Sequence, residues 1–424
     1  MRIQKNASLK LILIILFLFY VFASSFVVYK YQHRSGDNLF NLGFDFGSLV
    51  QNIVNNNIYK DGIFTGHRMP LIPYFLSAIA LAYNNLLFAY LVKNLIFFSL
   101  LSACIYAAAK NSQHLNRYIL FGIAIYALSF PQLLLHGFSI EVEEGYLVAF
   151  ISALFVGLLY SGKIKNKWIF LCLALLNGLM FLTKTSMPFF SAMACLLYYF
   201  VTKSRKVFLT FAVVLVISAV SWGLFNLHNS GRFNISCSLN GYTFYKSNNE
   251  LTLTVYPKYS IDLLSDEIWS RRSKGDGMNE WDIDRYFVFK ALEFIKGHPL
   301  DEIRLLLLRL YVVFLGISDT ANIYGETHLL LKKIGMLYML IFRVIFLGSI
   351  LIAAKSIFAA KGRPLLEGDE RRTVSTVYLV FISSFIVYYL FGGVCQRHII
   401  PLVPVTLFYL VWILNENSRR ALYS

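Results

Sequence analysis

The stretch SGDNLFNLGFDFGSLVQNIVNNNIYKDGIFTGHRMPLIP, residues 35–73, organises this chain of 424 residues. It is polar, and strongly apolar segments lie on both sides of it. The residues after Asp45 favour a short helix with this carboxylate near its N-terminus, where a negative charge is stabilising. An acid and the following His67-Arg68 pair on one loop can handle a proton and an anion together. A solvated connecting loop is the plainer interpretation.

Composition sets the broad class of protein. Hydrophobic residues make up 57% of the chain and charged residues 15%, whereas an ordinary soluble domain has about 25% charged residues. The apolar residues form blocks close to the length of a bilayer-spanning helix, about 20 residues. We therefore expect an all-α polytopic membrane protein. The net charge of +16 then indicates attraction to anionic lipid, and no basic stripe with interleaved aromatics favours nucleic acid.

The hydropathy pattern predicts about ten transmembrane helices and a juxtamembrane helix over residues 71–83. We expect the first predicted span to be retained in the mature protein, because no small-residue cleavage site follows it. The expected spans cover residues 9–28, 86–109, 117–135, 145–160, 168–182, 187–201, 207–225, 334–359, 374–391 and 399–414.

This pattern divides the chain into three parts. Residues 1–225 form an N-terminal transmembrane module whose first outer loop covers residues 30–85. Residues 226–333 form a large polar loop, and residues 334–424 form a C-terminal transmembrane module. Residues 302–317 are apolar enough for a further span but contain Arg304 and Arg309. We expect them to form an interfacial helix with snorkelling arginines, since a span would place a basic loop outside.

Lysines and arginines concentrate in alternate short connections, which assigns those connections and both termini to the cytoplasm. The first outer loop and the large loop then share the extracytoplasmic face. The predicted location is the cytoplasmic (inner) membrane. Cys237 and Cys395 both fall on the outer side and can pair in an oxidising compartment, although spacing alone does not decide this.

The sequence lacks several familiar motifs. It contains no CxxC pair, no Walker loop and no GxGxxG after a strand. A nucleotide-driven pump and a sugar-nucleotide enzyme with a Rossmann domain are therefore disfavoured.

Polar groups from separate segments all map to the predicted outer face. Charges near membrane depth are costly and are usually functional or paired. Individually each has a structural explanation, such as a snorkelling lysine or an arginine at lipid headgroups. Their coincidence favours a functional site, and its members are Asp45, Glu141, Glu143, Glu144, Lys184, Asn248, Asn249 and Arg397.

The order of these motifs resembles the GT-C superfamily of membrane glycosyltransferases, in the branch of protein mannosyltransferases, aminoarabinose transferases and Rgt-type lipopolysaccharide transferases. The residues around Asp45 resemble the acidic first loop of that family, and RMPLIP at residues 68–73 resembles its R-x-P-x-x-P element. IEVEEGYL matches a glutamate at the start of the fourth span, best at Glu144. GLMFLTKT departs from the family's G-L-x-x-L-T-R-P, because Lys184 replaces arginine and Thr185 replaces proline.

Three further matches lie downstream, so the resemblance covers nearly the whole chain. SGRF and NGYTFYKSNN, residues 230–233 and 240–249, resemble the family's F-G-x-F and G-G-x-x-x-Y-x-x-N-N elements. The segment from Asp284 to Leu310 resembles a helix that precedes a juxtamembrane helix. RHIIPLVP at residues 397–404 resembles a basic R-x-x-x-P-L-x-P element.

The resemblance implies a GT-C fold and transfer of a sugar from a polyprenyl-phosphate donor to an extracytoplasmic acceptor. The acceptor is an envelope glycan, a lipopolysaccharide or lipid A, or a protein. Asp45 is the expected general base, and Glu144 orients a cation, the acceptor or a metal. No cofactor is expected, although a divalent metal is compatible with these carboxylates. The candidate substrate-binding residues are His67, Arg68, Glu143, Lys184, Tyr245, Asn248, Asn249 and Arg397.

Three rival functions remain. A lipid-linked sugar flippase or transporter also places charges on spans, but usually near midplane and with an inverted repeat. An O-antigen polymerase or ligase uses a similar donor and a large outer loop, but it leaves the acidic first loop unexplained. A purely structural membrane scaffold is the third.

Overall fold

In the computed structural model, the described residues are 14–15, 17–19, 21–23, 25, 38–41, 46–60, 65–112, 144–164, 166–257, 261–264, 268, 278–315, 329–358, 370–393 and 396–423. Within these residues the regular structure is entirely helical. The elements are η1 (Leu39–Asn41), α2 (Phe46–Asn56), α3 (Leu71–Ala82), α4 (Leu86–Asn111), α7 (Glu144–Leu159), η2 (Ser161–Lys163), α8 (Lys167–Phe181), α9 (Met187–Thr202), α10 (Arg205–Ser230), α11 (Asn240–Ser247), α12 (Thr252–Val255), η3 (Ile261–Leu264), α14 (Glu280–Gly297), α15 (Pro299–Phe314), α17 (Leu329–Phe358), α18 (Glu370–Gly392), α19 (Gln396–Ile399) and α20 (Leu402–Tyr423).

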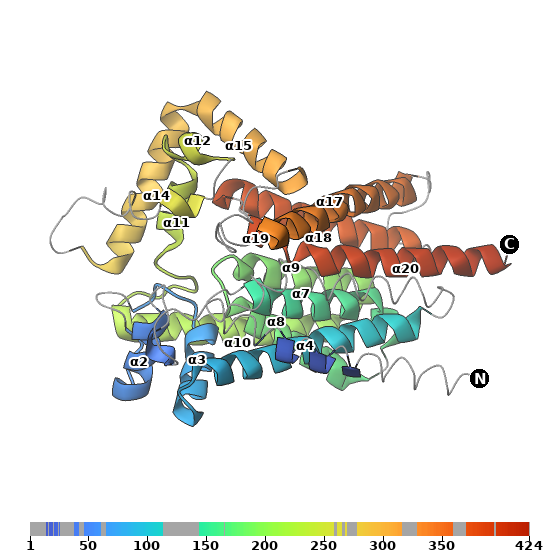
Figure 1. Ribbon diagram of the computed structural model, residues 1–424, viewed down its shortest axis with the longest axis horizontal. Coiled ribbons are helices and arrows are strands. Elements are labelled where there is room, and N and C mark those ends of the chain that lie inside the picture. The colour runs from blue at the N-terminus through green and yellow to red at the C-terminus, as the bar shows by residue number, and fades with distance from the viewer. Residues whose placement is uncertain are drawn as a thin grey trace.

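A bundle of long apolar helices forms the body of the molecule (Figure 1). Helix α10 packs against α8 and α9, α4 packs against α7, and α17 packs against α18. Among the described helices, α4, α10, α17 and α18 are long and apolar enough to cross a membrane. Helices α3, α7, α8 and α9 are apolar but shorter. The chain is therefore a helical protein of membrane type, as its composition indicates.

Most of the predicted spans coincide with helices of the structure. Helices α4, α7, α8, α9, α10, α17, α18 and α20 lie where spans are expected. The predicted juxtamembrane segment forms helix α3, which begins at Leu71 behind Pro70. The predicted span at 117–135 lies outside the described residues, and only short pieces of the first span are described.

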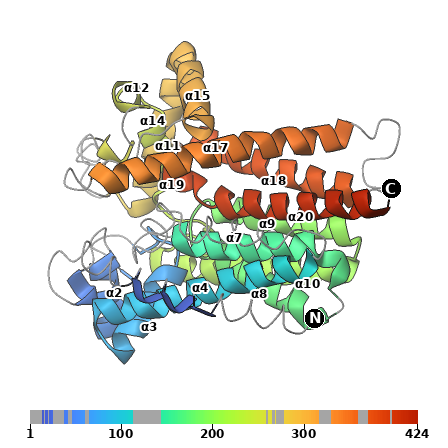
Figure 2. The same ribbon diagram turned by 45° about the vertical axis from the view of Figure 1, so that its right-hand side comes forward.

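The polar region, α11 to α15, stands beside one end of this bundle (Figures 1 and 2). Asn279 caps α14 by accepting hydrogen bonds from the backbone N–H groups of Trp281 and Asp282, at 3.0 and 3.1 Å. Helix α11 lies directly on α14, because Gly241 has no side chain to strike the backbone carbonyl of Asp284. The Gly241 N–H donates to Asp284 Oδ1 at 2.6 Å.

The two predicted outer loops lie at the same end of the molecule. Helices α2 and α3 of the first loop share this end with α11 and α14, and the C-terminus lies at the opposite end (Figure 1). This arrangement agrees with the expectation that both loops share one face. Helix α15 is steeply inclined to the bundle helices in both views, and its interfacial location stays a prediction (Figures 1 and 2).

One expectation for α15 is wrong. Arg309 does not snorkel to solvent, because its side chain is 1% exposed, whereas Arg304 on the same helix is exposed. Arg309 pairs with Glu302 of the same helix, with Nη1 3.0 Å from Oε1. Hydropathy alone recognises an arginine as a charge and does not reveal the partner that allows its burial.

Candidate functional site

A single backbone contact joins two of the motifs picked out in the sequence. The Leu71 N–H, at the start of α3, donates a hydrogen bond to the Leu182 carbonyl at 3.0 Å. The first N–H groups of a helix have no partner within the helix, and the carbonyl of the α8 cap supplies one here. The segment containing Arg68 and the turn containing Lys184 are therefore neighbours.

Arg68 lies against the beginning of α2. Its guanidinium lies over the ring of Phe46, 5.2 Å from the centroid, and Phe46 is the first residue of that helix. The Tyr59 hydroxyl donates to the Arg68 carbonyl at 3.0 Å, which fixes the loop backbone at this position. The helix expected after Asp45 is thus present, while Asp45 itself lies outside the described residues.

His67 lies in the interior of the protein, with 2% of its surface exposed. Burial, and secondarily the charge of Arg68, lowers the pKa of His67 to about 3 from the usual 6.5. The imidazole is therefore neutral at physiological pH. The predicted substrate-binding role of His67 stays a prediction.

Lys184 is half-buried in the turn between α8 and α9. It lies within electrostatic range of the Tyr388 hydroxyl on α18. The Tyr388 ring packs on Phe189 and Phe190 of α9, with centroids 6.0 and 5.5 Å apart. The lysine is thereby placed beside the end of α18 that leads to α19.

Arg397 lies in the short helix α19, directly before His398. The His398 ring stacks on Tyr389 at 4.5 Å, and Tyr389 is the neighbour of Tyr388 on α18. The segments carrying Lys184 and Arg397 therefore both lie near the same end of α18. The orientation of the Arg397 side chain lies outside the described residues, as does that of Glu144, the first residue of α7. Glu141 and Glu143 are outside them altogether.

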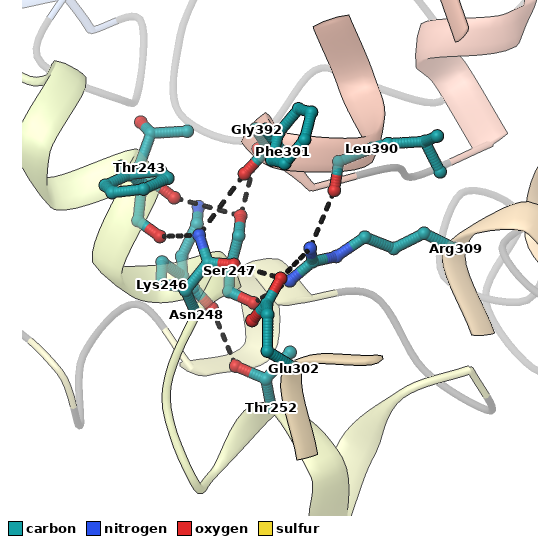
Figure 3. Close-up of polar contacts among 11 residues, drawn as sticks. Thr243, Lys246, Ser247, Asn248, Thr252, Glu302, Arg309, Leu390, Phe391 and Gly392 are labelled. Atoms are coloured by element: carbon teal, nitrogen blue, oxygen red, sulfur yellow. Dashed lines mark hydrogen bonds and ion pairs between the residues drawn. The ribbon is translucent and has the colours of Figure 1, made fainter. Parts of the chain in front are cut away.

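The predicted asparagines are bound by their own chain. Asn248 is 1% exposed and donates from Nδ2 to the carbonyls of Phe244 and Phe391, at 2.7 and 3.2 Å (Figure 3). Asn249 is fully buried and donates to the Tyr245 carbonyl at 2.6 Å. These amides hold the end of α11 in place. Tyr245 is similarly engaged, since its ring stacks on Phe287 at 5.7 Å.

Arg309, which was not among the predicted site residues, reaches into the contacts of Figure 3 from the right-hand side. Its guanidinium donates to the carbonyls of Leu390 and Ser247, at 2.6 and 2.5 Å, and to Asn248 Oδ1 at 2.8 Å. It thereby ties α15 to the ends of α11 and α18. Burial lowers the pKa of Arg309, and Glu302 partly offsets this. The sequence signal for this pair is its spacing of seven residues, which places both side chains on one helix face.

Glu280 was also missed, and it binds the loop that carries Arg68. Its side chain is 3% exposed. Oε1 accepts from the Thr65 N–H at 3.1 Å and from the Thr65 hydroxyl, while Oε2 accepts from the Gly66 N–H at 2.9 Å and the Ser238 hydroxyl at 2.7 Å. No local pattern distinguishes this glutamate from an ordinary residue in the first turn of a helix, because its partners are distant in sequence.

The described residues contain no group of three or more histidine, cysteine or acidic side chains arranged to hold a metal. Cys237 is buried, and its pairing with Cys395 stays a prediction, because Cys395 lies outside the described residues.

No protein-family model, curated protein or solved structure matches this chain. The sequence motifs and the contacts described above therefore carry the functional argument.

Proposed function

We propose that this protein is an integral membrane glycosyltransferase with a GT-C fold and about ten spans. It transfers a sugar from a polyprenyl-phosphate donor to an envelope glycan, lipid or protein acceptor. The active site lies on the extracytoplasmic face of the inner membrane, and both termini are cytoplasmic. One observation carries the proposal, which is the Leu71–Leu182 hydrogen bond. It brings the R-x-P-x-x-P segment and the L-T-K turn to the same end of the bundle, beside the helix that follows Asp45.

The reaction assigns a role to each charged residue. The acceptor hydroxyl attacks the anomeric carbon and gives its proton to the Asp45 carboxylate. The bond between the anomeric carbon and the phosphate oxygen breaks, and the lipid phosphate leaves with the electron pair. Arg68, Lys184 and Arg397 stabilise the charge on the leaving phosphate, because cations already in place are most effective there. Glu144 orients the acceptor or a cation.

The main test is Asp45→Asn. Asparagine keeps the size of the side chain and caps a helix about as well as aspartate. A general base contributes about 10² to 10⁴ in rate, so we expect turnover to fall by at least about 100-fold with normal membrane insertion. Transfer is measured with purified protein, a synthetic polyprenyl-phosphate sugar and an envelope extract as acceptor.

Asp37→Asn and Asp61→Asn are the matched controls, because both carboxylates lie on the same loop outside the motif. Retention of more than about a tenth of wild-type turnover by Asp45→Asn would remove Asp45 as the base. A flippase would instead move the donor across reconstituted vesicles without consuming it. This outcome would replace the proposed function.

A further inference from the structure

We propose that Glu280 is a positioning residue that presents Arg68 to the phosphate of a lipid-linked substrate. The inference rests on the proposed function and adds to it a partner from the polar region. Glu280 belongs to α14, more than 200 residues beyond the loop it binds, at a separation of 214 to Gly66. The large polar region thereby takes part in phosphate recognition without contacting the phosphate.

The contacts of Gly66 show how firmly this loop is held. Its N–H donates to Glu280 Oε2, and its carbonyl accepts from the Ser238 N–H at 2.9 Å. A side chain at this position would meet Asn226 Oδ1 at 2.9 Å and the Trp281 ring at 3.0 Å. At Gly66, just before the His67-Arg68 pair, the backbone N–H and the carbonyl are therefore both hydrogen-bonded. The backbone there packs closely between α10 and α14.

The hold continues on the other side of Arg68. The Arg68 carbonyl accepts a hydrogen bond from the Tyr59 hydroxyl. Three residues later, the Leu71 N–H donates to the Leu182 carbonyl. His67 points into the interior, whereas Arg68 remains partly exposed. The chain is thus fixed before, at and after the residue whose guanidinium must meet an anion. Groups held in advance stabilise developing charge without reorganisation, which is the benefit of such a support.

A carboxylate is suited to this position by its acceptor count. Each oxygen accepts two hydrogen bonds, from Thr65 on one side and from Gly66 and Ser238 on the other. Glutamine has almost the same shape but replaces one oxygen with an NH2 group, which cannot accept. Whichever oxygen is replaced, the new NH2 group faces one backbone N–H, of Thr65 or of Gly66, as a second donor, while the neighbouring hydroxyl can rotate to accept from it. Glu280→Gln therefore turns one attractive backbone contact into opposed donors while leaving α14 intact.

The experiment measures binding of farnesyl phosphate, with farnesol as the neutral probe, to the full-length protein in detergent. We expect Glu280→Gln to weaken binding of farnesyl phosphate by about tenfold or more, which is the scale of a hydrogen bond to a charged group. Farnesol binding should not change. Asp282→Asn is the matched control, since this residue lies on the same helical turn but forms an exposed pair with Arg232.

A double-mutant cycle with Arg68→Ala separates a positioning role of Glu280 from a general effect on protein stability. If Glu280 acts through Arg68, then Glu280→Gln weakens binding only while Arg68 is present. Equal effects in both backgrounds would overturn the inference. Ser238→Ala removes one hydroxyl donor and serves as a milder variant should Glu280→Gln fail to fold. It should weaken binding several-fold, again only with Arg68 present, and an unchanged affinity would likewise overturn the inference.

The outcomes also separate this inference from the proposed function. Wild-type protein that binds farnesyl phosphate no better than farnesol contradicts the proposed donor class. Phosphate-dependent binding that requires Arg68 but is unaffected by Glu280→Gln contradicts the positioning role alone.

Discussion

Two buried charged residues fasten the polar region to the rest of the molecule, and each matches the backbone groups it meets. Arg309 donates to the carbonyls of Ser247 and Leu390, which belong to the last turns of α11 and α18. The last carbonyls of a helix have no partner within the helix, and the helix dipole is negative at that end. A guanidinium supplies both hydrogen-bond donors and a positive charge there. Glu280 instead accepts N–H groups from a turn, and it lies at the positive end of α14.

The difference between these anchors concerns what each one holds. Arg309 connects three helices and carries an acid, Glu302, as its own counter-charge. The contacts of Glu280 described above are all hydrogen bonds from uncharged donors, and most of them belong to one loop. Substituting Glu280 should therefore change the position of Arg68 more than the stability of the fold. The comparison predicts a stability defect at the first anchor and a binding defect at the second.

The largest stability effect is expected for Arg309→Ala. This change leaves Glu302, which is 7% exposed, without its counter-charge, and breaking a buried pair costs about 3–5 kcal/mol. Thermal unfolding in detergent measures the loss. Arg304→Ala is the control on the same helix and should change stability by less than about 0.5 kcal/mol.

The matched double variant Arg309→Met with Glu302→Gln removes both charges and should recover part of the loss. Equal stability of Arg309→Ala and wild type would show that the network in Figure 3 contributes little.

A smaller, pH-dependent effect is expected at His67. Its folded pKa of about 3 lies below the unfolded value near 6.5, so protons bind the unfolded chain first as the pH falls. Stability is complete above pH 6.5 and decreases toward pH 3, by up to about 1.4 kcal/mol per pH unit. Unfolding midpoints between pH 7.5 and 4.5 test this against His67→Gln, which should lose the His67 contribution to the slope. The same slope in both proteins would place the titrating group elsewhere.

The smallest effect is expected at the ion pair of Arg232 and Asp282. Their side chains are 38% and 37% exposed, and pairs of this kind contribute about 0.2–1 kcal/mol. Arg232→Ala should therefore lower stability by less than about 1 kcal/mol and should do so less in high salt. A larger loss would mean that a third anchor exists beside Glu280 and Arg309.

The sequence predicts the local features of this fold well. Apolar blocks locate the helices, Pro70 marks the start of α3, and Asp45 marks the start of α2. Long-range partners follow no such pattern. Glu280 meets Thr65 and Gly66 only after folding, and burial of Arg309 depends on carbonyls supplied by α11 and α18. The motifs indicated which segments converge, but not the side chains that hold them together.

The brevity of α8 has a consequence for how the proposed lipid-phosphate donor would reach Lys184. Its 15 residues reach about 22 Å, whereas the hydrocarbon core of a bilayer is about 30 Å thick. If α8 spans the bilayer as the hydropathy pattern predicts, with Lys167 at one surface, the far end of the helix stops short of the other surface. The bilayer must then thin beside Lys184 or let water enter there. The phosphate of the proposed lipid-linked donor would reach the lysine by sinking a few ångströms, and its tail need not be drawn out of the membrane.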